Sequence, residues 1–277
     1  ADPSLTDLEA SANALKRDAV DFGYSLAEIS GESGPALIVG SPDENAIVQV
    51  TLPSIGHDVV FVPGDASGGD RFASVAAVPV SGSAERCGHS LTTMAGVDSG
   101  TQVIVGCPLK VNGGFIFKQD VWTDHVRFDD LGDDVIAAGA DSPYSEEFGS
   151  SLGVGDLNGD GIDDAIFGAR QDDYLCAGSN CGAAYVYFGD FFGEIPLTDL
   201  SVTDADAVIY GDQEEDALGS NVAILEDLEG DGRADVLVSS NHGWPDSSPE
   251  AGTGAVLVYT LSDWSGSYAE SDADHTF

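Results

Sequence analysis

Two short segments of this chain carry oxygen-bearing side chains at alternating positions, a pattern that can bind a metal ion. In each segment an acidic or amide residue stands at positions 1, 3, 5 and 9. These residues are Asp156, Asn158, Asp160 and Asp164 in the first segment, and Asp227, Glu229, Asp231 and Asp235 in the second. A hard cation such as Ca²⁺ binds six to eight oxygens at roughly 2.3–2.6 Å, and one tight loop can supply most of them. The spacing therefore predicts two Ca²⁺ sites.

The residues between these side chains favour a loop that wraps around a cation. Position 7 would contribute a backbone carbonyl, from Ile162 in the first segment and from Arg233 in the second. Gly161 and Gly232 stand where the chain must bend sharply, which a Cβ atom would hinder. We expect the side chain of Arg233 to face solvent. Glu229 is longer than an aspartate, so a less regular geometry is expected at the second site.

Other interpretations of the two segments compete with a calcium loop. An EF-hand needs a glutamate at position 12 and flanking helices, but Phe167 stands there, inside an apolar run. Mg²⁺ prefers a strict octahedron and keeps several waters, so it suits the segments less well. A solvated acidic turn that binds nothing is the remaining alternative.

Each acidic segment is followed by two apolar runs that are typical of β-strands. The runs are 165–169 and 182–188 in the first case, and 236–240 and 254–259 in the second. Because the pattern recurs 71 residues later, from Asp156 to Asp227, it belongs to a repeat.

Two earlier stretches share the strand pattern, but their turns are poor in carboxylates. The sequence thus predicts four units, at about 22–66, 72–140, 148–212 and 218–260. In the second unit Phe72 and the segment 87–91 compete as the start of the first strand.

These units resemble the FG-GAP repeat, the blade of integrin α-subunit β-propellers. The resemblance rests on Phe148-Gly149 with the segment 167–169, on Phe22-Gly23 with the segment 39–42, and on the two acidic segments. It implies an all-β fold in which four-stranded blades surround an axis, with Ca²⁺ in the hairpin between the first two strands of a blade. It also implies an extracellular adhesion or recognition context.

Four units would make a four-bladed propeller, at the low end of the known range of roughly 4–8 blades. The sequence at 5–8 recurs at 197–200, just before a predicted outer strand. We therefore expect residues 5–20 to supply the outer strand of the last blade and close the ring, which makes residues 1–277 a single domain. Because integrin propellers have seven blades, a section of a larger seven-bladed propeller is the alternative.

The charge balance excludes several classes of partner. The 277 residues include 49 acidic and 9 basic ones, a formal net charge of −40. Such a surface repels nucleic acid and anionic membranes. Apolar runs stay far below the ~20 residues that span a bilayer. We expect no nucleic-acid partner, no membrane insertion and a monomeric protein.

The four cysteines are an even number, which favours disulfides and an oxidising compartment. Cys176 and Cys181 flank a short segment, and Cys87 would then pair with Cys107. Three connectivities are possible, of which this one is favoured. A zinc site is disfavoured because no CxxC motif accompanies the cysteines. The protein is predicted to be secreted or exposed at the cell surface.

Signals of catalysis are weak. The segment 149–153 fits the GxSxG pattern, but a nucleophile elbow needs a strand–turn–helix setting. Here the segment begins a predicted strand, and the five histidines show no metal-binding spacing. We therefore expect no enzymatic activity.

The preferred function is a calcium-binding β-propeller that binds a protein or glycan through one face. Loops such as 171–182 and 240–252 would form that face, since loops on a rigid scaffold usually carry recognition. The alternatives are a hydrolase on a propeller scaffold and a purely structural module of a longer adhesin.

Overall fold

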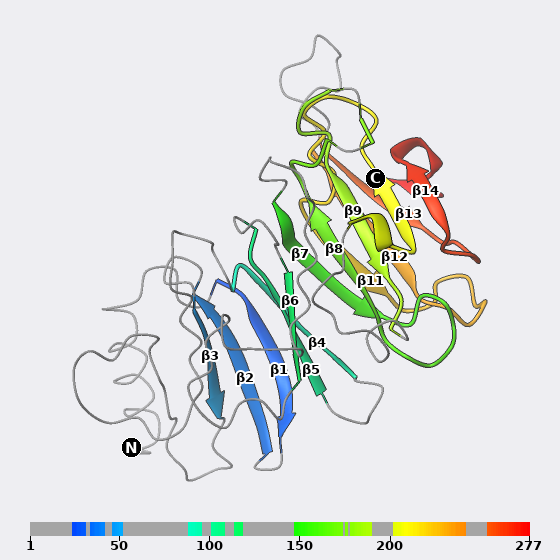
Figure 1. Cartoon of the computed structure of the whole chain (residues 1–277). Helices are drawn as coiled ribbons and strands as arrows, with labels where there is room; N and C mark the ends of the chain where they lie inside the picture. The colour runs from blue at the N-terminus through cyan, green and yellow to red at the C-terminus, as the bar shows by residue number, and fades with distance from the viewer. Residues whose placement is uncertain are drawn as a thin grey trace, which may run out of the picture.

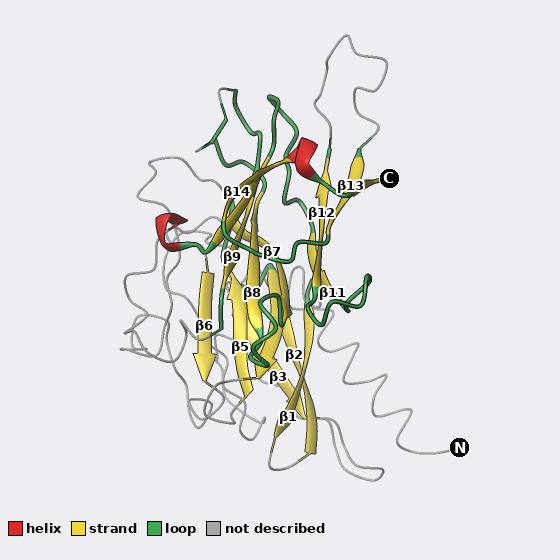
Figure 2. Ribbon diagram, turned by 90° about the vertical axis from the view of Figure 1, so that its right-hand side faces the viewer, coloured by secondary structure: helices red, strands yellow, loops and turns green. Residues whose placement is uncertain are grey.

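The described part of the protein is built from β-strands, with almost no helix (Figures 1 and 2). A computed structural model describes residues 24–31, 34–41, 46–51, 88–95, 101–108, 114–118, 147–173, 175–176, 178–189, 202–241 and 254–277. Within these ranges the helical segments are two short 3₁₀ turns, η5 (Val202–Asp204) and η6 (Glu270–Asp272). Neither is long or apolar enough to span a bilayer. The predicted all-β class is thus confirmed.

The first two sheets are antiparallel and have three described strands each. The first sheet contains β1 (Leu26–Gly31), β2 (Gly34–Ser41) and β3 (Ala46–Thr51). The second contains β4 (Ser90–Ala95), β5 (Thr101–Gly106) and β6 (Gly114–Lys118). The first strand of the second sheet therefore follows Gly88, while the competing start at Phe72 lies outside the described residues.

The third and fourth sheets carry the two acidic segments. The third has the order β14-β10-β9-β8-β7 and the fourth the order β11-β12-β13-β15. The strands of the third sheet are β7 (Phe148–Gly155), β8 (Asp164–Ala169), β9 (Ala183–Tyr187), β10 (Ala207–Tyr210) and β14 (Gly266–Ala269). Those of the fourth are β11 (Val222–Leu225), β12 (Asp235–Ser240), β13 (Ala255–Tyr259) and β15 (His275–Thr276).

The last residues of the chain complete the outer edges of both sheets. After β13 the chain crosses to the third sheet, where β14 pairs with β10 in parallel, and returns so that β15 pairs with β13. The buried Trp264 anchors this crossing segment. β15 occupies the outer position for which residues 5–20 were predicted, and residues 5–20 lie outside the described part of the chain.

The core lies between stacked sheets, because the third sheet buries both of its faces. Alternate residues of β8 and β9 point to opposite sides. Phe167, Tyr185 and Tyr187 pack toward Met94 and Ile104 of the second sheet. Ile166 and Val186 pack toward the fourth sheet, against side chains such as Val236 and Leu257. The apolar runs that predicted strands therefore belong to strands covered on both faces.

A repeated contact joins neighbouring sheets and explains the glycines of each unit. Ser25, Ser90 and Ser151 donate hydrogen bonds of 2.7, 2.7 and 2.9 Å to carbonyl oxygens in the next unit, those of Gly88, Gly149 and Gly219. A Cβ atom on Gly40, Gly106 or Gly168 would lie 2.0, 1.9 or 2.1 Å from the same oxygens. Only glycine allows so close an approach. We call this contact the junction.

The junction sets the order of the sheets along the molecule. The first strands β1, β4, β7 and β11 are successive neighbours, and the sheets form an open row from lower left to upper right in Figure 1. The fourth unit carries Asn221 and Ser239 where the third has Ser151 and Gly168. The Ser239 hydroxyl is used within its own unit, where it accepts the Asn221 N–H at 2.9 Å.

Candidate metal centre

Both acidic segments form the loop between the first and second strands of their unit. The first joins β7 to β8 and the second joins β11 to β12. The two loops lie side by side, since the Ala234 N–H donates to the Asp156 carbonyl at 2.8 Å. The predicted ligand residues are therefore gathered at one end of the third and fourth sheets.

The first aspartate of each loop organises the backbone around it. The Asp156 carboxylate accepts the N–H groups of Gly159, Asp160 and Gly161 at 2.7, 3.1 and 2.8 Å. Asp227 accepts the corresponding groups of residues 230, 231 and 232 at 2.6, 3.1 and 2.7 Å. These N–H groups, that of Gly232 foremost, lower the pKa of Asp227. Both loops thus fold around a carboxylate that accepts three backbone N–H groups.

The glycines make this wrapping possible. Gly159 and Gly161 have φ of 79° and 85°, and the equivalent Gly230 and Gly232 have φ of 84° and 92°. These values lie in the left-handed region that other residues rarely adopt. The turn glycine predicted from the sequence is therefore accompanied by a second one, two residues earlier.

In the first loop several predicted ligands hydrogen-bond with one another. The Asn158 amide N–H donates to Asp160 at 2.9 Å, and the other Asp160 oxygen accepts the Ile162 N–H at 2.7 Å. To offer an oxygen to a cation at the same place, the Asn158 amide would have to rotate.

Asp164, the last predicted ligand of this loop, is fully buried. One carboxylate oxygen accepts the Leu157 and Asn158 N–H groups at 2.7 and 3.2 Å, and the other accepts the Gly189 N–H at 2.7 Å. Burial raises the pKa of Asp164 to about 7, against the opposing effect of these N–H groups. Asp164 therefore ties the loop to the end of β9.

The second loop brings three carboxylates close together. Single oxygens of Asp227, Glu229 and Asp235 all lie within 4.8 Å of one another. Oxygens on opposite sides of one Ca²⁺ are about 5 Å apart, twice the metal–oxygen distance, so this donor set fits the ion. Partial desolvation, followed by the neighbouring Asp235 and Asp231 charges, raises the pKa of Glu229. A bound cation would relieve this repulsion.

Asp231 and Arg233 point elsewhere. Asp231 accepts the Arg233 N–H at 3.0 Å, and the Arg233 guanidinium lies 3.9 Å from its other oxygen. Arg233 was expected to face solvent, and its side chain is 36% exposed, but its guanidinium also contacts two other segments. Its Nε donates to the Asn158 carbonyl at 3.2 Å and its Nη1 to the Ser262 carbonyl, because the first loop and the crossing segment lie within reach. Arg233 therefore links the two loops.

The disulfide prediction is confirmed for Cys176–Cys181, which closes the loop after β8. Cys107 is also disulfide-bonded, and its predicted partner Cys87 lies outside the described residues. Of the two loops predicted to recognise a partner, 171–182 is largely described, whereas residues 242–252 are not.

The GxSxG segment lies within β7 and its serines serve the fold. The buried Ser151 donates to the Gly219 carbonyl in the junction, and Ser150 donates to the Gly168 carbonyl at 3.2 Å. Neither setting is the strand-to-helix turn that a nucleophile elbow requires.

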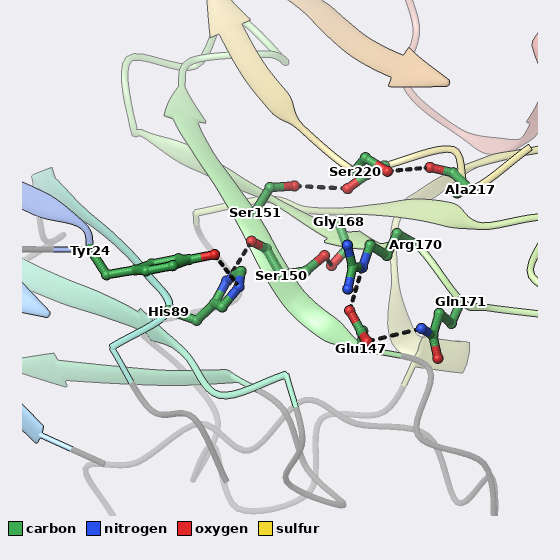
Figure 3. A network of polar contacts seen from close by, with 11 residues as sticks. Tyr24, His89, Glu147, Ser150, Ser151, Gly168, Arg170, Gln171, Ala217 and Ser220 are labelled. Carbon is green, nitrogen blue, oxygen red and sulfur yellow. Dashed lines mark hydrogen bonds and ion pairs between the residues drawn. The ribbon is translucent and has the colours of Figure 1, made fainter. Parts of the chain in front are cut away.

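A polar network at the opposite end of the sheets was missed by sequence reasoning (Figure 3). Its members include Tyr24 and His89, which directly follow Gly23 and Gly88 at the starts of their units. The repeat itself could have indicated this network. Where the first strands of successive units are neighbours, the residues that follow the glycine at the start of each unit must lie close together.

One segment of the chain matches a known protein family. Residues 148–188, which run from β7 through the first acidic loop to the end of β9, match the FG-GAP repeat. No curated protein matches the chain.

Proposed function

We propose that this chain, which carries an FG-GAP repeat at residues 148–188, is a calcium-binding recognition module of the β-propeller type that acts outside the cytosol. The observation that carries the proposal is the carboxylate cluster of Asp227, Glu229 and Asp235. It lies in the fourth unit, outside the matched segment, in the hairpin that corresponds to the acidic loop of that segment, where an FG-GAP repeat is expected to bind Ca²⁺. The Cys176–Cys181 disulfide supports an oxidising compartment.

In the second loop the bound Ca²⁺ would be held by Asp227, Glu229 and Asp235, with the Arg233 carbonyl as a further oxygen. In the first loop Asp156, Asn158 and Asp160 would be the principal ligands, with the Ile162 carbonyl, while Asp164 braces the loop. Because Arg233 joins the two loops, occupation of one would steady the other. The role of the ion is therefore structural: it offsets the repulsion among carboxylates that the fold forces together.

Recognition rather than catalysis is proposed because both serines of the GxSxG segment have structural contacts: Ser151 forms the junction, and Ser150 donates to the Gly168 carbonyl within its own unit. The third sheet is covered on both faces, so the loops at the ends of the sheets are the places for a partner. The described sheets stand in an open row (Figure 1), with β15 rather than residues 5–20 at the outer edge of the fourth sheet. For the whole chain we propose that this row closes into a four-bladed ring.

Calcium binding is tested by thermal unfolding and titration calorimetry on the full chain. Removal of Ca²⁺ with EDTA should lower the melting temperature by several degrees, roughly the effect of 1–2 kcal/mol on a domain of this size. Glu229→Gln should weaken binding about tenfold and leave the three N–H groups that Asp227 holds in place, since Glu229 accepts none of these three. Glu226→Gln removes the same charge from an exposed neighbour and is the matched control. Equal melting curves with EDTA and with Ca²⁺ would refute the metal sites.

A further inference from the structure

A composite polar site lies at the end of the sheets opposite the acidic loops. Tyr24, His89 and Ser150 occupy the same position in three successive units, just before or at the start of β1, β4 and β7. Arg170 and Gln171 follow β8, whose end lies beside the start of β7. Figure 3 shows these side chains together, although they are distant in sequence.

Hydrogen bonds from one unit to the next fix the first half of the site. His89 Nδ1 lies 3.0 Å from the Ser150 carbonyl oxygen, which can only accept, so Nδ1 carries the proton. In the neutral ring Nε2 is then the acceptor, and the Tyr24 hydroxyl donates to it at 3.1 Å. The two rings are 4.7 Å apart, and Tyr24 remains 49% exposed. The tyrosine ring is thus held in place while much of its surface faces solvent.

The second half of the site is an arginine held by a carboxylate. Arg170 Nε donates to Glu147, and Gln171 donates to the other Glu147 oxygen at 2.9 Å. Glu147 is the main reason that the pKa of Arg170 is raised. The Arg170 side chain is 44% exposed, and its η nitrogens have no hydrogen-bond partner among the described residues. They are oriented donors open to a ligand.

The charge of the site selects the class of ligand. Glu147 balances the charge of Arg170, so this ion pair adds no net charge to the site. The whole chain carries −40, which repels anionic ligands. The site nevertheless offers the exposed ring of Tyr24, the guanidinium donors of Arg170, and the side-chain amide oxygen of Gln171 as an acceptor. An uncharged sugar matches all of these, because it presents an apolar C–H face beside hydroxyls that both accept and donate.

We propose that Tyr24, Arg170 and Gln171, with His89 and Glu147 as positioning residues, bind an uncharged carbohydrate. The proposal rests on the proposed function and narrows the expected partner from a protein or a glycan to a glycan. The tyrosine ring would stack on the sugar ring, and the arginine and glutamine would bond its hydroxyls. Because the groups come from three units, the site exists only when the units are stacked.

The test is a glycan array probed with the full chain in Ca²⁺, followed by calorimetry with a neutral oligosaccharide that binds. Tyr24→Ala should weaken binding about tenfold or more, as expected for an aromatic anchor, whereas Tyr24→Phe should change it only a few-fold. Arg170→Gln should also weaken it about tenfold. Leu175→Ala, at an exposed residue of the loop after β8, is the control that should bind as the wild type does. Unchanged melting temperatures would show that the variants are folded.

Several outcomes would overturn the proposal. The array could give no glycan signal, or show binding to acidic glycans alone. Binding of a neutral glycan could survive both Tyr24→Ala and Arg170→Gln. Finally, the chain could bind a protein partner in a way that depends on Tyr24. The calcium titration is independent of all of them. Loss of the metal sites with retained Tyr24-dependent sugar binding would refute the calcium role alone, and the reverse would refute the sugar site alone.

Discussion

Among single residues, Asp164 shows how a predicted ligand can also be a structural residue. Its buried carboxylate accepts three backbone N–H groups, from the loop at Leu157 and Asn158 and from Gly189 after β9. The equivalent Asp235 accepts the Leu228 N–H at 2.7 Å and also belongs to the carboxylate cluster. The same position of the repeat thus stabilises the fold in the third unit, as Asp164, and belongs to the carboxylate cluster in the fourth unit, as Asp235.

This difference predicts that alanine substitutions of Asp164 and Asp235 lower the free energy of unfolding by different amounts in the absence of metal. Asp164→Ala leaves three N–H groups without their acceptor and should lower the free energy of unfolding by about 3 kcal/mol, since each buried unsatisfied group costs roughly 1–3 kcal/mol. Asp235→Ala should cost about 1–2 kcal/mol. Urea unfolding in EDTA, followed by tryptophan fluorescence to which the buried Trp264 contributes, measures both losses. An equal or smaller loss for Asp164→Ala would contradict its bracing role.

At the scale of secondary-structure elements, the junction holds neighbouring sheets against one another. Each junction needs a serine on the first strand, a glycine on the second, and a glycine carbonyl from the next unit. The fourth unit replaces the serine with Asn221 and the glycine with Ser239. A neighbour on that side of the fourth unit would therefore have to pack in another way.

The junction predicts that Gly168 tolerates no side chain. In Gly168→Ala the new Cβ would lie 2.1 Å from the Gly219 oxygen, so the third and fourth sheets must move apart, at a cost of about 3 kcal/mol or more. Ser239→Ala at the equivalent position should cost about 1 kcal/mol, the worth of one hydrogen bond. Chemical denaturation compares the two. A loss below about 0.5 kcal/mol for Gly168→Ala would mean that the sheets are not in close contact.

The Cys176–Cys181 disulfide is a local element and should have a modest, local effect. It closes a loop with a sequence separation of 5, for which the chain-entropy estimate is about 2 kcal/mol. The double variant Cys176→Ser/Cys181→Ser should lose about that much stability and keep its strand content by circular dichroism. Loss of the β-sheet signal at ambient temperature would show that the loop nucleates the third sheet instead.

On the scale of the whole molecule, the net charge of −40 opposes compaction everywhere. In the described residues Arg170 and Arg233 each serve a specific contact, with Glu147 and between the two loops respectively. They leave little positive charge to offset the acidic surface. The stability of the protein must therefore depend on counterions.

This dependence predicts that salt stabilises the fold. In EDTA, raising NaCl from about 0.05 M to 1 M should raise the melting temperature by several degrees, because the Debye length shrinks to about 3 Å and carboxylate repulsion is screened. Calorimetry across a salt series measures the shift in melting temperature. Because EDTA removes calcium, the screening of carboxylate charges is measured separately from calcium binding. A melting temperature that falls with NaCl would show that ion pairs outweigh the repulsion.

The sequence by itself determined the features that depend only on residues close together in the chain. The acidic loops, their turn glycines and most of the strand runs follow from residue spacing, because a hairpin loop folds on its own neighbours. The Cys176–Cys181 pair belongs to the same category, since its two cysteines lie in one loop. The all-β class and the FG-GAP repeat followed from the same local patterns.

Tertiary structure alone decided which distant residues meet. The bridge from Arg233 to the first loop, the Tyr24–His89 contact and the crossing segment with β14 and β15 all join residues that no local pattern relates. Among the described residues the second acidic loop forms a carboxylate cluster and the first, which has the same spacing, does not, because Asp164 is drawn to Gly189. Such contacts depend on how sheets stack, and stacking is fixed by the shape of whole surfaces.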